Sequence, residues 1–142
     1  NNFLVPIGTP ISYLVECAGG LCRHPKKVVL GGSMRGHSVW DLETPITKNT
    51  SSVLVLSEFF DRESKYEAVC VRCGRCVDAC PMGLVPFKIA NAAQNQDFEL
   101  SESLHADYCI ECGCCSYICP GKLFLVQAIR MAKCNLPKNA NH

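Results

Sequence analysis

The feature that most restricts how this chain can fold is a cysteine pattern that occurs twice. The first copy covers residues 70–81 and the second covers residues 109–120, and both read C-x2-C-x2-C-x3-C-P. Eight of the 12 cysteines lie in these two copies. Because the spacing and the closing proline are both repeated, we expect the eight thiols to bind inorganic cofactors and not to act as acids, bases or nucleophiles.

This cysteine run is the one that bacterial two-cluster ferredoxins use to hold [4Fe–4S] clusters. Its first three cysteines surround one cube, whereas the fourth ligates the other cube. We therefore predict two [4Fe–4S] clusters, with electron transfer as their chemistry. The first cluster is assigned to Cys70, Cys73, Cys76 and Cys119, and the second is assigned to Cys109, Cys112, Cys115 and Cys80.

Two other uses of cysteine fit the pattern less well. Structural zinc sites favour separated C-x2-C pairs, often with histidine, and neither run contains a histidine. A zinc-stabilised interaction module is thus the alternative from another functional class. Twelve cysteines among 142 residues also approach the density of a disulfide scaffold. Such scaffolds rarely repeat this run, so metal binding in a reducing compartment is favoured.

The two runs differ in charge. Arg72 and Arg75 lie within the first run, and Glu111 takes the position of Arg72 in the second run. Positive charge near a cluster stabilises its reduced form, so this difference predicts a higher potential for the first cluster. The alternative is that all three charged groups are solvated loop residues.

The other cysteines lack metal-binding motifs. Cys17 and Cys22 are expected to be small buried residues, Cys114 to be a bystander beside a ligand, and Cys134 to follow a helix. Trp40 is expected to pack or to be partly exposed, although an aromatic side chain facing a partner is the alternative.

Length and composition set outer bounds on function. A chain of 142 residues is enough for one domain or for two very small ones. The formal net charge is +1, without a long basic patch, so no nucleic-acid partner is expected. The longest aliphatic run, residues 53–56, is far too short to span a bilayer. Any association with a membrane is therefore expected to occur through partner proteins.

Composition divides the chain into four parts. Residues 1–57 contain two cysteines and several β-type runs, and residues 67–134 contain the other ten. We predict an α+β fold, with a small β-rich lobe over 1–57 and a helical two-cluster domain over 67–134. Residues 58–66 are predicted to form a polar connector, and residues 135–142 a polar tail.

Periodicity predicts the elements of each part. In the first part we expect a helix that starts at Thr9-Pro10, with Thr9 as N-cap, and stops at Gly19-Gly20. Strands are expected at 3–5, 27–30, 46–47 and 53–56. In the second part helices are expected at 85–94, 102–107 and 123–133. Helices between the cysteine runs favour a helical lobe over a small β-rich ferredoxin.

The second half of the chain resembles the C-type member of the Rnf/Rsx electron-transport complex. The resemblance is carried by both cysteine runs and by the segments that follow them, which are 78–84, 116–120, 125–127 and 132–133. The first half resembles the SLBB domain of that family, a β-grasp module, at residues 5–10, 27–32 and 45–48. Two segments depart from the family pattern: Gly31-Gly-Ser-Met-Arg-Gly36, and Gly121-Lys-Leu-Phe124 before the last helix.

The resemblance implies an electron-transfer module of an ion-translocating ferredoxin:NAD⁺ oxidoreductase. The fragment itself would be an electron carrier, and its partners would be the other subunits of a membrane complex and soluble ferredoxin. It would be peripheral, at the cytoplasmic face of the bacterial inner membrane. FMN and NADH are implied only for a region of the parent protein ahead of this chain. A truncated lobe would leave an exposed sheet edge near Phe3–Val5.

A second host remains open within the same chemistry. Related helical ferredoxin-like subunits serve cobalamin reductases and heterodisulfide reductase-type enzymes, and the cysteine runs alone do not separate these hosts.

Overall fold

The computed structural model describes residues 1–21, 25–56 and 69–136. The chain divides into two compact units, Asn1–Glu63 and Ser64–His142. The predicted connector at 58–66 and nearly all of the predicted tail at 135–142 lie outside the described residues, as does Cys22. Each unit has its own group of buried apolar side chains, and each is described by itself.

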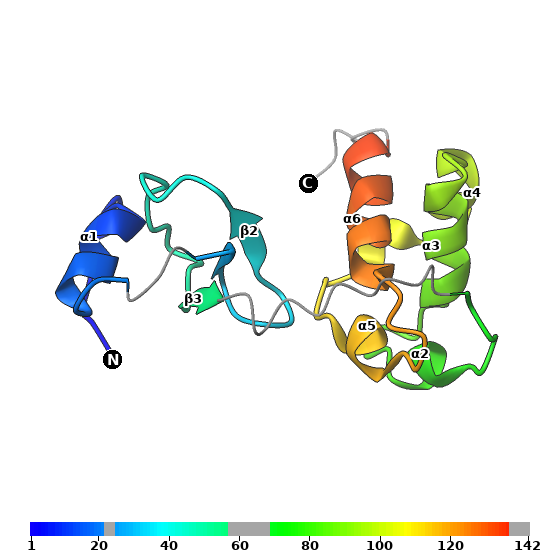
Figure 1. The fold of residues 1–142 in the computed structure, drawn as a ribbon. Coiled ribbons are helices and arrows are strands. Elements are labelled where there is room, and N and C mark those ends of the chain that lie inside the picture. Colours follow the sequence, from blue (N-terminus) through cyan, green and yellow to red (C-terminus); the bar gives the residue numbers. More distant parts are fainter. Residues whose placement is uncertain (22–24, 57–68, 137–142) are drawn as a thin grey trace. The chain divides into compact units, whose positions relative to one another are not determined.

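The first unit contains a three-stranded antiparallel sheet in the order β2-β1-β3 (Figure 1). Its strands are β1 Lys27–Leu30, β2 His37–Val39 and β3 Val53–Leu56. Val28 of the central strand pairs with Val39 on one side and with Val55 on the other. β1 is central because its valines are buried, whereas the outer strands keep exposed positions.

Helix α1, Ile11–Cys17, supplies the rest of this small core. Ile11 is fully buried and forms one apolar group with Val28 and Ile46. The helix ends where predicted. Gly20 adopts a φ of 80° and donates its N–H to the carbonyl of Val15 at 2.9 Å, which satisfies a carbonyl at the helix end.

Four details of this unit differ from the sequence predictions. Residues 3–5 and 46–47 are not strands, and β2 was not predicted. Pro10, not Thr9, is the N-cap of α1. Pro10 and Pro45 form an isolated antiparallel bridge, and this bridge cannot grow into a ladder because proline has no N–H to donate. Among the described residues the sheet edges are therefore β2 and β3, not a strand near Phe3–Val5.

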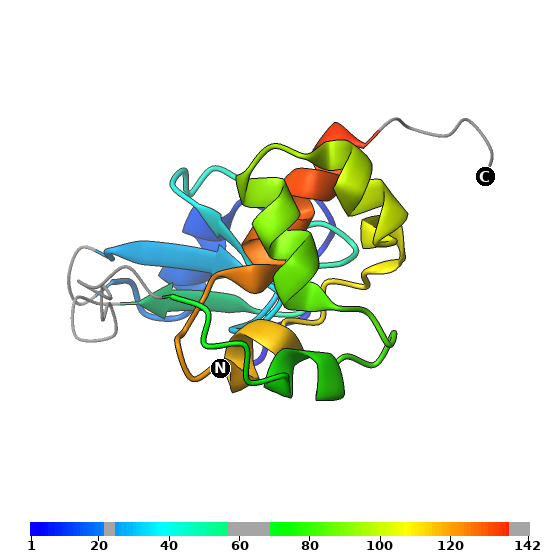
Figure 2. The same ribbon diagram turned by 90° about the vertical axis from the view of Figure 1, so that its right-hand side faces the viewer.

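The second unit is helical throughout its described residues. Its elements are α2 Arg75–Asp78, α3 Pro86–Gln94, α4 Phe98–Ser103, the 3₁₀ turn η2 Ala106–Tyr108, α5 Cys114–Ile118 and α6 Leu125–Asn135. Helices α3 and α6 lie side by side in both ribbon views (Figures 1 and 2). Ile89 of α3 and Ile129 of α6 are almost completely buried and belong to the same core. The predicted helical lobe is thus confirmed.

Helix boundaries in this unit were predicted with unequal success. The expected helix at 85–94 matches α3 almost residue for residue, and the one at 123–133 begins and ends two residues early relative to α6. The helix expected at 102–107 is wrong. Instead α4 starts after Asp97, whose carboxylate accepts the N–H of Leu100 at 2.9 Å, and it ends at Ser103. The short helices α2 and α5 were not predicted, because four or five residues carry no readable periodicity.

The second unit is built from two similar halves. Gly74 and Gly113 are the N-caps of α2 and α5, with φ angles of 79° and 82°. Each run then turns in the same way after its last cysteine, since Gly83 donates to Cys80 O and Lys122 donates to Cys119 O, both at 3.1 Å. Helices α3 and α6 follow at the same offset. The repeated sequence therefore folds as a repeated loop, short helix and long helix.

Candidate cluster-binding sites

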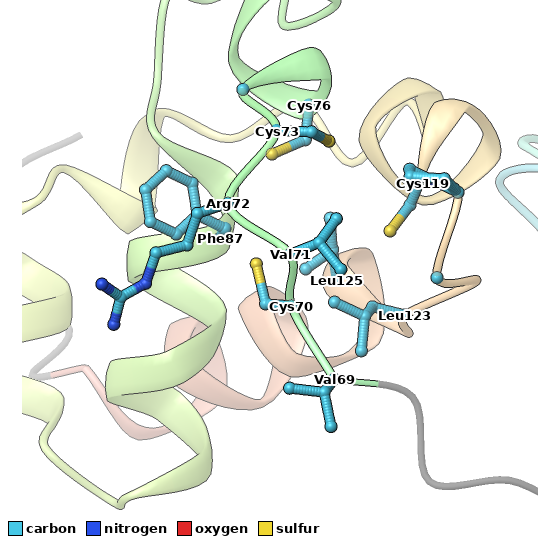
Figure 3. A pocket seen from close by; sticks show the side chains of 13 residues that line it. Val69, Cys70, Val71, Arg72, Cys73, Cys76, Phe87, Cys119, Leu123 and Leu125 are labelled. Atoms are coloured by element: carbon cyan, nitrogen blue, oxygen red, sulfur yellow. The ribbon is translucent and has the colours of Figure 1, made fainter.

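Four cysteines from both runs surround one hollow in the second unit. Its volume is about 370 Å³, and the three leading cysteines of the first run line it together with Cys119 (Figure 3). The labelled sulfur atoms of Cys73, Cys76 and Cys119 stand around this space, and apolar side chains close its walls. The apolar lining side chains are those of Val69, Val71, Phe87, Leu123 and Leu125. The structure thus brings together the four residues assigned to the first cluster.

A second hollow is built in the same way from the opposite combination. Its volume is about 340 Å³, and it is lined by Cys109, Cys112 and Cys115 with Cys80 from the first run. Its apolar wall includes Leu84, Val126 and Ile129. The fourth cysteine of each run therefore faces the hollow of the other run, as predicted for crossed ligation.

Both hollows are far larger than a single ion requires. Each exceeds the roughly 30 Å³ that one water molecule occupies in the liquid by about tenfold. In the part of the chain that the structure describes, no three His, Cys, Asp or Glu side chains gather closely enough to hold a single metal ion. Eight sulfurs around two roomy apolar spaces suit an inorganic cluster, and so the residues present fit a [4Fe–4S] cube in each hollow.

Local backbone conformation places the first two cysteines of each run. Arg72 and Glu111, which precede Cys73 and Cys112, have φ angles of 53° and 55°. This left-handed conformation is uncommon outside glycine, and it turns the chain sharply between the two cysteines. Glu111 also donates its backbone N–H to Cys109 Sγ at 3.4 Å. Such N–H groups compensate the negative charge that a sulfur carries when it binds iron.

The two sites differ in exposure. Cys70 and Cys73 are exposed, whereas Cys109 and Cys112 are partly buried. Burial raises the pKa of Cys76 and Cys109, and it raises the pKa of Cys115 to about 11. In the cluster-free chain these thiols are therefore protonated at neutral pH, and iron must displace their protons when it binds.

Glu111 is the centre of an ion-pair group beside the second site. Its carboxylate accepts from Arg130 Nε at 2.8 Å and from Lys133 Nζ at 3.0 Å, and both cations belong to α6. Lys133 also donates to the backbone carbonyl of Cys109 at 2.8 Å. Desolvation alone would raise the pKa of Glu111, but the hydrogen bonds and charges of Lys133 and Arg130 lower it below its usual range. Glu111 is therefore not the freely solvated loop residue that the sequence alternative describes.

Other residues singled out in the sequence lie away from the hollows or beside them. Cys17 is exposed, so its expected burial is wrong, and Cys134 is also exposed. Trp40 is fully exposed, which excludes the predicted packing role. Cys114 is partly buried and lines neither hollow, and a hydrogen bond with Cys112 raises its pKa. Among the described residues no helix is both long and apolar enough to cross a membrane.

Sequence reasoning missed the functional contacts that α5 and α6 make with the second run. Arg130, Lys133 and Ser116 are ordinary surface-type residues in the sequence. Only the docking of α6 brings the two cations to Glu111 and places the backbone N–H of Val126 3.0 Å from Ser116 Oγ.

Known proteins match both the domain and nearly the whole chain. Residues 69–123 match the 4Fe-4S dicluster domain family. The C-type member of the ion-translocating oxidoreductase complex from Methanosarcina acetivorans is 43% identical over 138 residues, which is 97% of this chain and 31% of the relative. The protein of the same name from Rhodobacter capsulatus is 42% identical over 95% of this chain, and the one from Yersinia pestis is 38% identical over 69% of it.

The chain belongs to the RnfC family.

The resemblance deduced from the cysteine runs is thereby confirmed. The chain spans between about a quarter and a third of the length of the first two RnfC relatives. A dicluster domain accounts for the pair of four-cysteine hollows, and the predicted two [4Fe–4S] clusters are the cofactors that this domain family carries. The match also favours iron–sulfur clusters over the zinc-stabilised alternative.

Proposed function

We propose that this chain is an electron-transfer module of an RnfC protein in an Rnf-type ion-translocating ferredoxin:NAD⁺ oxidoreductase. The observation that carries the proposal is the pair of hollows, each lined by three cysteines of one run and one of the other. When bound, each [4Fe–4S] cluster accepts and gives up one electron. The printed names of the relatives favour this host over the cobalamin reductase and heterodisulfide reductase alternatives.

The chain itself contributes ligands, shielding and a rigid spacing. Cys70, Cys73, Cys76 and Cys119 would hold the first cluster, and Cys80, Cys109, Cys112 and Cys115 the second. Apolar walls limit the access of water, which lowers the local dielectric and favours the cluster state with less charge. The packing of α3 against α6 supports both hollows, because each helix follows one remote cysteine directly.

The proposal extends to the domains and partners predicted from the sequence. Residues 1–57 would be an SLBB-like β-grasp lobe that positions or binds a partner, and residues 67–134 the two-cluster domain. The three-stranded sheet with one packed helix supports a small α+β lobe in that role. Other subunits of the complex, and soluble ferredoxin, would be the electron partners at the cytoplasmic face of the membrane. FMN and NADH would bind elsewhere in the parent protein.

Anaerobic reconstitution tests the proposal. The chain should bind about eight irons with matching sulfide, four for each [4Fe–4S] cluster. It should be brown, and dithionite should bleach its broad visible absorption reversibly and yield an EPR signal from reduced clusters. Reduced chain should then pass electrons to free FMN under anaerobic conditions. Colourless protein with one or two zinc ions and no sulfide would overturn the proposal in favour of the zinc-stabilised module.

A further inference from the structure

The two cysteine loops are held to the rest of the domain in different ways. In the second loop, the carboxylate of Glu111 bonds to Arg130 and to Lys133, and Lys133 reaches on to the carbonyl of Cys109. The side chains of all three ionic residues are only 19–29% exposed, so water screens these contacts incompletely. Helix α6 therefore grips the second loop at both a side chain and the backbone.

The first loop has no such grip. Arg72 occupies the position of Glu111 with the same backbone conformation, but it makes no ion pair within the described residues. Its neighbours Cys70 and Cys73 are exposed, whereas Cys109 and Cys112 are partly shielded. Both differences act in the same direction, because a loop without such contacts opens more often and an exposed sulfur is reached more easily when it does.

We propose that Glu111 is a positioning residue that fixes the second cysteine loop to α6, so that the first cluster is the labile one and the second is held firmly. The inference rests on the proposed ligand sets. It adds to them a ranking of the two sites and a residue outside the ligands that creates the ranking. An electron carrier built in this way loses its exposed cluster first when iron is withdrawn.

The test follows which cysteines become free as iron is removed. The anaerobically loaded chain is mixed with excess bathophenanthroline disulfonate, samples are alkylated with iodoacetamide, and peptides are read by mass spectrometry. We expect Cys70 and Cys73 to become alkylated roughly fivefold faster than Cys109 and Cys112, the difference that a partly shielded ion pair supplies. Exposed Cys17 and Cys134 react from the start and serve as internal references.

The isosteric variant Glu111→Gln separates loop fixation from general stability. It should speed alkylation of Cys109 and Cys112 by roughly fivefold and leave the rate at Cys70 and Cys73 unchanged. The matched control Glu102→Gln removes an exposed glutamate of α4 and should change neither rate. A variant that merely weakened the whole domain would speed both pairs together, and that outcome would overturn the proposal.

A second variant keeps the test decisive if Glu111→Gln does not load with iron. Arg130→Gln combined with Lys133→Gln removes the two cations and should reproduce the selective loss at the second site. Adding Glu111→Gln to this pair should produce little further change, because the three side chains act as one unit. Equal alkylation rates at the two pairs in the unaltered chain would defeat the ranking and leave the proposed function intact. If none of the eight cysteines were protected before chelation, the ligand assignment itself would be wrong.

Discussion

Arg72 and Glu111 occupy the same position in the two cysteine runs and share the left-handed backbone conformation, with φ angles of 53° and 55°. Their side chains have opposite charges and different surroundings. Arg72 is exposed, whereas Glu111 binds two cations of α6. The backbone of the repeat is therefore preserved while its electrostatics differ. Since the pair of cations offsets the charge of Glu111, the difference in charge between the two sites is smaller than the sequence suggests.

Crossed ligation predicts which cluster each remote cysteine supports. Cys80→Ala should damage the second cluster although Cys80 belongs to the first run, and Cys119→Ala should damage the first. Each variant should retain about four of roughly eight irons after anaerobic reconstitution. Iron and sulfide analysis gives the loss, and protection of the remaining cysteines from iodoacetamide identifies the surviving site. The neighbouring variant Cys114→Ser should keep both clusters. Retention of full iron by Cys80→Ala would contradict the crossed assignment.

The turn after each remote cysteine predicts opposite effects for two substitutions. Gly83 and Lys122 occupy equivalent positions with φ angles of 65° and 54°. Lys122→Gly should stabilise the chain by about 0.5–1 kcal/mol, since the strain of a left-handed lysine exceeds the added freedom of the unfolded glycine. Gly83→Ala should destabilise it by about 1 kcal/mol through backbone strain alone, because no atom lies within 4 Å of the added methyl group. Thermal unfolding of the two variants should move in opposite directions.

The bond between Ser116 and the start of α6 predicts a specific loss of stability. Ser116 Oγ accepts the N–H of Val126 at 3.0 Å, and this N–H has no partner within the helix because it lies in the first turn. Ser116→Ala should therefore cost roughly 1 kcal/mol, as for the loss of an N-cap. Denaturant unfolding gives the value. Ser103→Ala, which removes an exposed hydroxyl from the end of α4, should cost less than half as much.

The core between α3 and α6 predicts a larger effect. Ile129 is 1% exposed, and Met131, two residues along the same helix, is 42% exposed. Ile129→Ala should destabilise the domain by about 2–5 kcal/mol, since it removes buried methyl groups and leaves a cavity beside the second site. Met131→Ala should cost well under 1 kcal/mol. Comparable losses in the two variants would contradict the packing described for α6.

The elements that sequence reasoning located correctly are those with a clear local signal. The helix at Pro86–Gln94 has apolar residues at helical spacing and a proline in its first turn, and the strand at Lys27–Leu30 ends at two glycines. Strand β2, His37–Val39, has no such pattern and exists because β1 offers it a buried partner. The apolar residues at 3–5 and 46–47 failed as strands for the opposite reason, since no ladder partner is available there among the described residues.

The cysteine spacing alone determined the two candidate ligand sets and the resemblance to the RnfC family, because covalent order limits which sulfurs can converge on one cube. Tertiary structure alone decided how the two sites differ. The contacts that separate them join residues far apart in the sequence, Glu111 to Arg130 and Lys133, and Ser116 to Val126. No periodicity or spacing encodes such contacts, since they depend on the face that α6 turns toward the second loop when it packs against α3.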